Sequence, residues 1–161
     1  MKHEATLTLP GGNWTVIIED DELISCRHGV SSHGLPEAPG NHPILCALRA
    51  YAGGDLLALD EIPVAQPGGE FHTVVREVMR RIPPGCTVSY SELAAMAGRP
   101  AAARAAAGAC ARNQVAVVVP CHRVIRGDGG LGGYAYGLGV KETLLAFERE
   151  HAGKRPGCGG F

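Results

Sequence analysis

Apolar and polar positions alternate in the first part of the chain, which is the pattern of β-strands with one buried face. Residues 14–19 and 23–26 are rich in β-branched and apolar side chains. The acidic run 20–22 lies between them and predicts a tight connection, so the two segments are expected to form a hairpin. The following stretch, 28–42, is rich in Gly, Pro and Ser and predicts a loop.

The pattern then changes to the three-and-four spacing of an amphipathic helix. Apolar side chains recur at this spacing from Ile44 to Tyr51, until glycines at positions 53 and 54 end the run. Residues 57–64 predict a further strand. Together these elements indicate a small α/β domain over residues 1–65.

A second domain is expected after a segment of linker composition, residues 66–70. From position 71 to 82, apolar side chains again step by three and four, which predicts an amphipathic helix that the following Pro-Pro-Gly run must end. Ser89 and Glu92 then form a capping-box pattern at the start of a short helix.

The next segment predicts a second helix directly after the short one. Gly98 can supply a left-handed cap, Pro100 suits the first turn of a new helix, and residues 101–112 are almost all alanine. Helix, tight turn and helix form a DNA-docking shape. Close packing against another helix is the alternative explanation for a helix with so little bulk.

Charge is divided between the two halves of the chain. Residues 1–70 contain three Lys or Arg against ten Asp or Glu, whereas residues 71–161 contain twelve against six. A basic half favours contact with a polyanion, although two solvated surfaces would give the same count. Arg104, the one long side chain among the alanines, is therefore expected to enter a groove or fill a gap in a base stack.

The cysteines and the hydropathy exclude two classes of protein. The six cysteines show no CxxC pair and no regular framework, and the N-terminus has no apolar segment of the kind that directs secretion. No apolar run approaches the roughly 20 residues that cross a bilayer. We therefore expect a cytoplasmic protein with reduced thiols and no membrane partner.

The chemistry of the chain is concentrated around Cys121. Residues 115–119 have the composition of a buried strand that Pro120 ends, so Cys121 is expected where that strand leaves the core. A thiol reacts as the thiolate and needs a base or a positive field, which His122 and Arg123 offer. A purely structural Cys-His pair is the alternative, and it remains our interpretation of the other five cysteines.

A helix expected over residues 140–151 carries Glu148 on its apolar side, one turn beyond Leu144. A carboxylate in that position needs a partner. If the partner is His122, Glu148 would fix the tautomer of the imidazole and stabilise its protonated form. A glutamate that reaches water from the edge of the apolar stripe is the alternative.

These motifs resemble the O6-alkylguanine-DNA alkyltransferases, also called methylated-DNA-protein-cysteine methyltransferases. The resemblance is nearly continuous over residues 71–151, and its most specific part is the run Val-Pro-Cys-His-Arg-Val at 119–124. It is weaker over residues 1–65. It implies an α+β fold in which a small, ribonuclease H-like N-terminal α/β domain precedes a winged helix-turn-helix domain over residues 71–153, with a flexible tail at 154–161.

The resemblance also implies roles for individual residues. His122, acting through a water and oriented by Glu148, would help form the Cys121 thiolate. Tyr90 would donate to ring N3 and so offset the charge that builds on the departing guanine, and Asn113 would tie the helix-turn-helix to the reactive loop. The implied DNA-binding residues are Arg104, Ala105, Arg112 and Arg123, and the implied pocket residues are Val124, Tyr134, Ala135 and Tyr136.

The expected activity is that of a methylated-DNA-[protein]-cysteine S-methyltransferase acting on double-stranded DNA. It would repair O6-alkylguanine, and O4-alkylthymine as a second substrate, in a single turnover, because the thioether formed on Cys121 offers water no ester to cleave. The protein itself is the nucleophile, so no cofactor is expected and a monomer suffices. Some members of the family bind zinc, and Cys26, His28 and His33 are the candidate ligands, but they lack the paired spacing of a zinc site.

Three other functions fit parts of the sequence. An alkyltransferase-like protein that recognises DNA damage without repairing it would lack the reactive cysteine that stands here at Cys121. A thiol hydrolase would use the Cys121, His122 and Glu148 set but would not need a helix-turn-helix. A plain DNA-binding regulator would not need the adjoining Cys and His. Three departures from the family pattern also stand out: Gln114 follows Asn113 where proline is usual, Tyr136 brings a ring to the pocket, and the N-terminal half is shorter than in many members.

Overall fold

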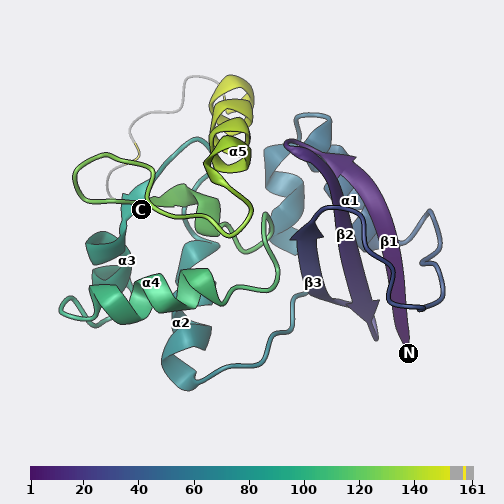
Figure 1. Ribbon diagram of the computed structural model, residues 1–161, viewed down its shortest axis with the longest axis horizontal. Coiled ribbons are helices and arrows are strands. Elements are labelled where there is room, and N and C mark those ends of the chain that lie inside the picture. Colours follow the sequence, from purple (N-terminus) through teal and green to yellow (C-terminus); the bar gives the residue numbers. More distant parts are fainter. Residues whose placement is uncertain (153–157, 159–161) are drawn as a thin grey trace.

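The computed structural model describes residues 1–152 and 158 of the 161. The tail expected to be flexible, 154–161, lies outside the described residues except for Cys158. The N-terminal half forms a sheet covered by a helix, and the C-terminal half is mainly helical; the two lie side by side and the chain crosses between them after residue 65 (Figure 1). The fold is therefore α+β, as expected.

Three strands form the N-terminal sheet. They are β1 (Lys2–Leu9), β2 (Gly12–Glu19) and β3 (Glu22–His28), antiparallel in the order β1-β2-β3. The predicted hairpin is β2 and β3, and its turn places Asp20 and Asp21 at positive φ, as two-residue hairpin turns require. Strand β1 was missed, although its residues alternate between apolar and polar.

Helix α1 (Pro43–Ala52) begins and ends where the pattern predicted. Its first turn is capped by His42, whose Nδ1 accepts a hydrogen bond from the amide of Ile44 at 3.1 Å. The strand expected over residues 57–64 is wrong: the chain forms the 3-10 helix η1 (Leu56–Glu61) and then makes a single bridge from Val64 to Leu23. Leu56 and Leu59, three residues apart, are the buried pair of η1, which is the spacing of a 3-10 turn.

From residue 66 to residue 152, the chain forms four α-helices and a two-stranded parallel ladder. The elements are α2 (Glu70–Met79), β4 (Val88–Ser89), α3 (Tyr90–Met96), α4 (Ala103–Ala111), β5 (Val124–Ile125) and α5 (Leu138–His151). The capping box at Ser89 is confirmed, since both of its hydrogen bonds are 3.0 Å long. Gly98 has φ +86° after α3, as expected, whereas Pro100 lies in the turn before α4 and not in its first helical turn.

Residues 115–119 are buried, as predicted, but they do not form a strand. Val117 adopts φ +70°, which no strand allows, and the segment folds into successive turns. Only Val115 pairs in the manner of a strand, with Cys26 of β3, through backbone bonds of 2.9 and 3.1 Å. A run of valines reports burial correctly here, because a packed turn and a buried strand both need apolar side chains.

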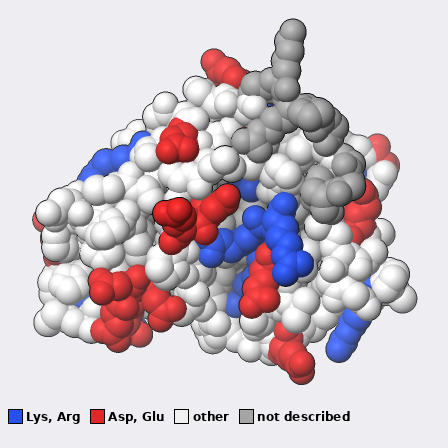
Figure 2. Space-filling view, turned by 180° about the vertical axis from the view of Figure 1, so that it is seen from behind, with Lys and Arg blue, Asp and Glu red and all other residues white. Residues whose placement is uncertain are grey.

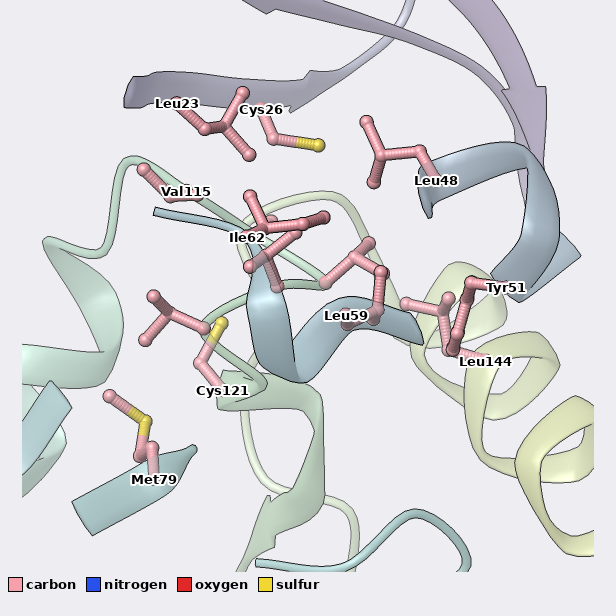
Figure 3. Packing of buried hydrophobic residues seen from close by; sticks show 14 of the residues in the cluster. Leu23, Cys26, Leu48, Tyr51, Leu59, Ile62, Met79, Val115, Cys121 and Leu144 are labelled. Atoms are coloured by element: carbon pink, nitrogen blue, oxygen red, sulfur yellow. The ribbon is translucent and has the colours of Figure 1, made fainter. Parts of the chain in front are cut away.

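One apolar core runs through both halves of the molecule. Figure 3 shows Cys26 of the sheet close to Val115, and Tyr51 of α1 next to Leu144 of α5. The expectation that no cysteine is paired is wrong for two of the six, because Cys86 and Cys158 form a disulfide. No helix in the described part of the chain is long and apolar enough to cross a bilayer.

Candidate active site

Cys121 lies at the base of a cavity of about 210 Å³ between the two helices of the turn motif and the segment 133–136. Pro120 interrupts the backbone hydrogen bonding, and residues Cys121–Arg123 form the short 3-10 turn η2 that follows it. The thiol is only 8% exposed, so a reactant reaches it by entering this cavity. The side chains that line the cavity include Tyr90, Cys110, Asn113, Cys121, Tyr134, Ala135 and Tyr136.

Asn113 holds the reactive loop in place. Its Nδ2 donates to the carbonyl oxygen of Val119 at 2.8 Å and to Sγ of Cys121 at 3.3 Å, while its Oδ1 accepts from the backbone amide of Val115 at 3.2 Å. Gln66, from the segment between the halves, donates to the same Oδ1 at 2.9 Å. One buried amide therefore connects α4, the turns of 115–119 and the sulfur atom.

Glu148 lies at the centre of a buried network on the other side of the loop. Its Oε2 accepts hydrogen bonds from Nε2 of His122 at 2.9 Å and from the hydroxyl of Tyr51 at 2.7 Å. Arg123 donates to both carboxylate oxygens at 2.8 Å. Burial alone would raise the pKa of Glu148, but the charge of its neighbours and these hydrogen bonds outweigh it, so the pKa lies below its usual range and the carboxylate stays ionised.

The network fixes which nitrogen of His122 is basic. Because Nε2 donates to an ionised carboxylate, the proton of the neutral ring lies on Nε2 and the lone pair lies on Nδ1. Among the described residues, Nδ1 is buried and has no hydrogen-bond partner. Burial lowers the pKa of His122 despite the opposing effect of Glu148, so the ring is neutral at rest and can accept a proton.

Cys121 itself is a thiol at rest. Burial raises its pKa above the ordinary value, and the hydrogen bond from Asn113 and the charge of Lys141 only partly oppose this. Cys121 thus presents a protonated sulfur to the cavity, and the next residue in the chain, His122, is a neutral base that an ionised carboxylate orients. This set can form a thiolate when a reactant fills the site and the proton moves to the imidazole.

Comparison with known proteins decides the family. A sequence profile described as the DNA binding domain of 6-O-methylguanine DNA methyltransferase matches residues 70–150, half of the chain. The chain belongs to this family. A methylated-DNA-protein-cysteine methyltransferase of Mycolicibacterium paratuberculosis is 48% identical over 105 residues, which cover 65% of this chain and 63% of that protein. A human protein of the same name is 45% identical over 98 residues, 61% of this chain and 47% of that one.

The fold of the family is matched over nearly the whole chain. The crystal structure of Mycobacterium tuberculosis OGT in complex with DNA superimposes with a TM-score of 0.80 at 33% identity, covering 92% of this chain and 94% of the other. By contrast, the sequence match spans less than two thirds of the length of the first curated relatives.

One site residue expected from the family, Arg123, is not placed to contact DNA. Arg123 was expected to bind DNA, but it is 4% exposed, and its guanidinium is used by Glu148 and by the carbonyl oxygen of Ile82. The side chain of Val124 is buried in the pairing with Val88 and does not line the cavity, and the role expected for its backbone, contact with the guanine amino group, stays a prediction. Arg104, Ala105 and Arg112 are exposed on or at the end of α4.

Sequence reasoning missed Tyr51 and Lys141. Lys141 is fully buried, and its Nζ donates to the carbonyl oxygens of Val124 at 2.7 Å, Gly133 at 3.3 Å and Leu131. It therefore ties the wall of the cavity, residues 131–133, to β5. The available signal was position: Lys141, like Glu148, falls on the apolar stripe that Leu144 and Leu145 form along α5.

The zinc ligands considered from the sequence do not come together. Cys26 is buried in the core, His28 contacts the carbonyl oxygen of Gly11 through Nε2 at 2.8 Å, and His33 pairs with Glu4. Over the residues that the structure describes, no group of three side chains is arranged to hold a metal ion.

Proposed function

We propose that this protein repairs double-stranded DNA by transferring the alkyl group of O6-alkylguanine, and of O4-alkylthymine, to Cys121. The observation that carries the proposal is the placement of Cys121 at the base of a cavity, with its sulfur held by Asn113 and with the His122–Glu148 pair behind the same turn. The curated relatives named above as methylated-DNA-protein-cysteine methyltransferases support the same activity.

The reaction is a displacement at the alkyl carbon. The Sγ proton passes through a water to Nδ1 of His122, whose protonated form is stabilised by Glu148. The thiolate attacks the alkyl carbon in line with the bond to O6, a sulfur–carbon bond forms, and the electrons of the broken bond leave with guanine. Tyr90, which lines the cavity, donates a hydrogen bond to ring N3 of the departing base and so offsets the charge on guanine until guanine takes up a proton from water. The thioether persists, so each molecule acts once.

The same proposal assigns the DNA-binding surface. Helices α3 and α4 act as the helix-turn-helix of a winged domain over residues 71–153, while residues 66–70 link it to a ribonuclease H-like domain over 1–65. Arg104, Ala105 and Arg112 are exposed and free of ion pairs with described residues, as groups that contact DNA need to be. The small side chains of α4 let its backbone approach the minor groove, and Arg104 fills the space of the flipped guanine.

Intact-protein mass spectrometry tests the transfer directly. The protein is incubated with a duplex that contains one O6-methylguanine, beside the variants Cys121→Ser and Cys46→Ser. We expect one mass gain of about 14 Da in the wild type and in Cys46→Ser, where an exposed thiol has been removed, and none in Cys121→Ser. Tight binding to this duplex without a mass gain would instead identify a damage-recognition protein.

A further inference from the structure

A second cavity adjoins the reactive loop and shares no lining residue with the cavity that Cys121 lines. It measures about 250 Å³ and is enclosed by the segment 64–66 between the two halves, by one face of α2 and by Val119. Thr73, Arg76 and Glu77 of α2 line it, together with Arg80, the residue directly after this helix. The proposed reaction uses none of these four side chains.

Arg76 is a buried cation without a counter-charge. The residue is 7% exposed, and its Nη2 donates to the carbonyl oxygen of Pro67 at 2.9 Å. Within the described part of the chain, its Nε is buried without a hydrogen-bond partner and no carboxylate lies within ion-pair distance. The guanidinium is packed so closely against Gly68 that a Cβ added there would overlap Nη2. The side chain is therefore held in place, with donor capacity left over.

Arg80, four residues after Arg76 and at the C-cap of α2, presents a second guanidinium to the same cavity. Its Nη2 donates to the carbonyl oxygen of Leu59 at 2.8 Å, and it too makes no ion pair with a described carboxylate. Two acidic groups lie near the two guanidinium groups. Glu77 lines the cavity, and the charge of Asp60 partly opposes the lowering of the pKa of Arg80 that burial causes. Neither of them satisfies the pair of guanidinium groups.

We propose that this cavity is a binding site for a phosphate-type oxyanion, held between Arg76 and Arg80. A desolvated guanidinium is stable when an anion accepts its free N–H groups, and the planar fork of arginine matches the oxygens of a phosphate. The cavity is larger than one such ion, so water fills the remainder and separates the ion from Glu77. The ion is either free phosphate or a phosphate of the DNA backbone.

An ion in this position would stabilise the conformation of the reactive loop. Gln66 and Val119 form part of the cavity wall, and both are bonded to Asn113, which in turn donates to Sγ of Cys121. Arg76 and Arg80 already contact carbonyl oxygens on the N-terminal side of α2, at Pro67 and Leu59. An ion that neutralises the two cations would therefore stabilise the packing of α2 against the segment between the two halves.

Titration of the whole protein with inorganic phosphate, followed by calorimetry at ionic strength held constant with chloride, tests the site. We expect saturable binding with a Kd on the order of 1 mM and a rise in the thermal midpoint of unfolding as phosphate is added. Arg76→Gln and Arg80→Gln should each weaken binding about tenfold, the loss of one charge-assisted contact. Arg81→Gln, an exposed arginine next to this pair in the chain, should bind as the wild type does.

Two results would overturn the proposal: no saturable binding of phosphate by the wild type, or unchanged binding in both Arg76→Gln and Arg80→Gln. Circular dichroism shows which variants are folded, and the wild-type titration needs no variant. Addition of an undamaged duplex then identifies the source of the ion. Displacement of phosphate by the duplex assigns the site to the DNA backbone, and simultaneous binding of both assigns it to free phosphate.

Discussion

Replacing Tyr51 by Phe isolates the contribution of the N-terminal half to the buried network. The change removes one hydroxyl, which donates to Oε2 of Glu148 at 2.7 Å, and leaves the ring packed against Phe147 at a centroid distance of 5.4 Å. A hydrogen bond to a buried charged group stabilises a fold by about 1.5–3 kcal/mol. Urea denaturation should therefore show a loss of about 2 kcal/mol in the free energy of unfolding, with an unchanged m-value.

The same variant should change the pH dependence of alkyl transfer. With one donor fewer, the carboxylate of Glu148 interacts more strongly with His122, which raises the pKa of the imidazole. Because His122 accepts the thiol proton only when neutral, the acidic limb of the rate profile should move to higher pH. Single-turnover rates between pH 5 and 8 measure this shift, and a role of Tyr51 in packing alone would leave the profile where it is.

Tyr134→Phe is the matched control for stability. Its hydroxyl is also buried but has no hydrogen-bond partner among the described residues, so its removal should leave the free energy of unfolding unchanged or slightly raised. If Tyr51→Phe and Tyr134→Phe unfold at the same urea concentration as the wild type, the hydrogen bond to Glu148 contributes nothing and the reasoning about the network is refuted.

Three further predictions concern the walls and the charges of the site. Lys141→Met leaves buried carbonyl oxygens without their donor and should cost about 2–4 kcal/mol of unfolding free energy in urea; an unchanged midpoint would contradict the bracing role of Lys141. The ring of Tyr136 packs edge-on against Trp14, with the ring centroids 5.5 Å apart, and narrows the cavity. O6-benzylguanine should therefore react at least about ten times more slowly than O6-methylguanine, and equal rates would exclude a steric role of Tyr136. Burial lowers the pKa of His122 in the folded state, so that below pH 6.5 the unfolded chain binds a proton at this residue that the folded chain does not. The free energy of unfolding should therefore decrease as the pH falls below 6.5, by up to about 1.4 kcal/mol per pH unit, and the decrease should be less steep in His122→Asn.

The parts of the fold that the sequence predicted are those with a local cause. The capping box at Ser89, the left-handed glycine at position 98 and the hairpin of β2 and β3 follow from a few neighbouring residues, and all three are present. Two elements were predicted wrongly as strands: residues 115–119 are an apolar run whose burial was correct, whereas in residues 57–64 only Leu59 and Ile62 are buried. Their backbone shape depends on the rest of the fold, because a run of apolar residues fits a packed turn as well as a strand.

The site residues, too, could be predicted where the cause is local and not where it depends on the rest of the fold. The adjacent Cys121 and His122 and the apolar stripe of α5 were enough to suggest the pairing of His122 with Glu148, which is confirmed at 2.9 Å. Tyr51 could not be found in this way, because it lies 97 residues from Glu148 in the chain and only the packing of the two halves brings them together. Arg123 was misjudged for the related reason that its charge is satisfied by a residue far away in sequence.

Charge is also distributed differently in space from its distribution along the chain. Figure 2 shows basic side chains gathered near the middle of one face, with acidic side chains on either side of them. The more basic half of the sequence thus does not give a uniformly basic surface, because three of its cations, Arg76, Arg123 and Lys141, are buried. A count of charges by sequence overstates the positive field available to a polyanion.

The outer strands of the N-terminal sheet are covered by irregular chain. Leu23 of β3 exchanges backbone hydrogen bonds with Pro63 and Ala65, and Cys26 does the same with Gln114 and Ala116. On the opposite side, Glu4 of β1 bonds to Pro36 and Ala38. An uncovered strand edge is a template for pairing with other chains, so these short contacts guard the molecule against aggregation. A fragment that ends before residue 114 would expose part of the β3 edge and would be expected to associate into oligomers and deposits that the intact chain avoids.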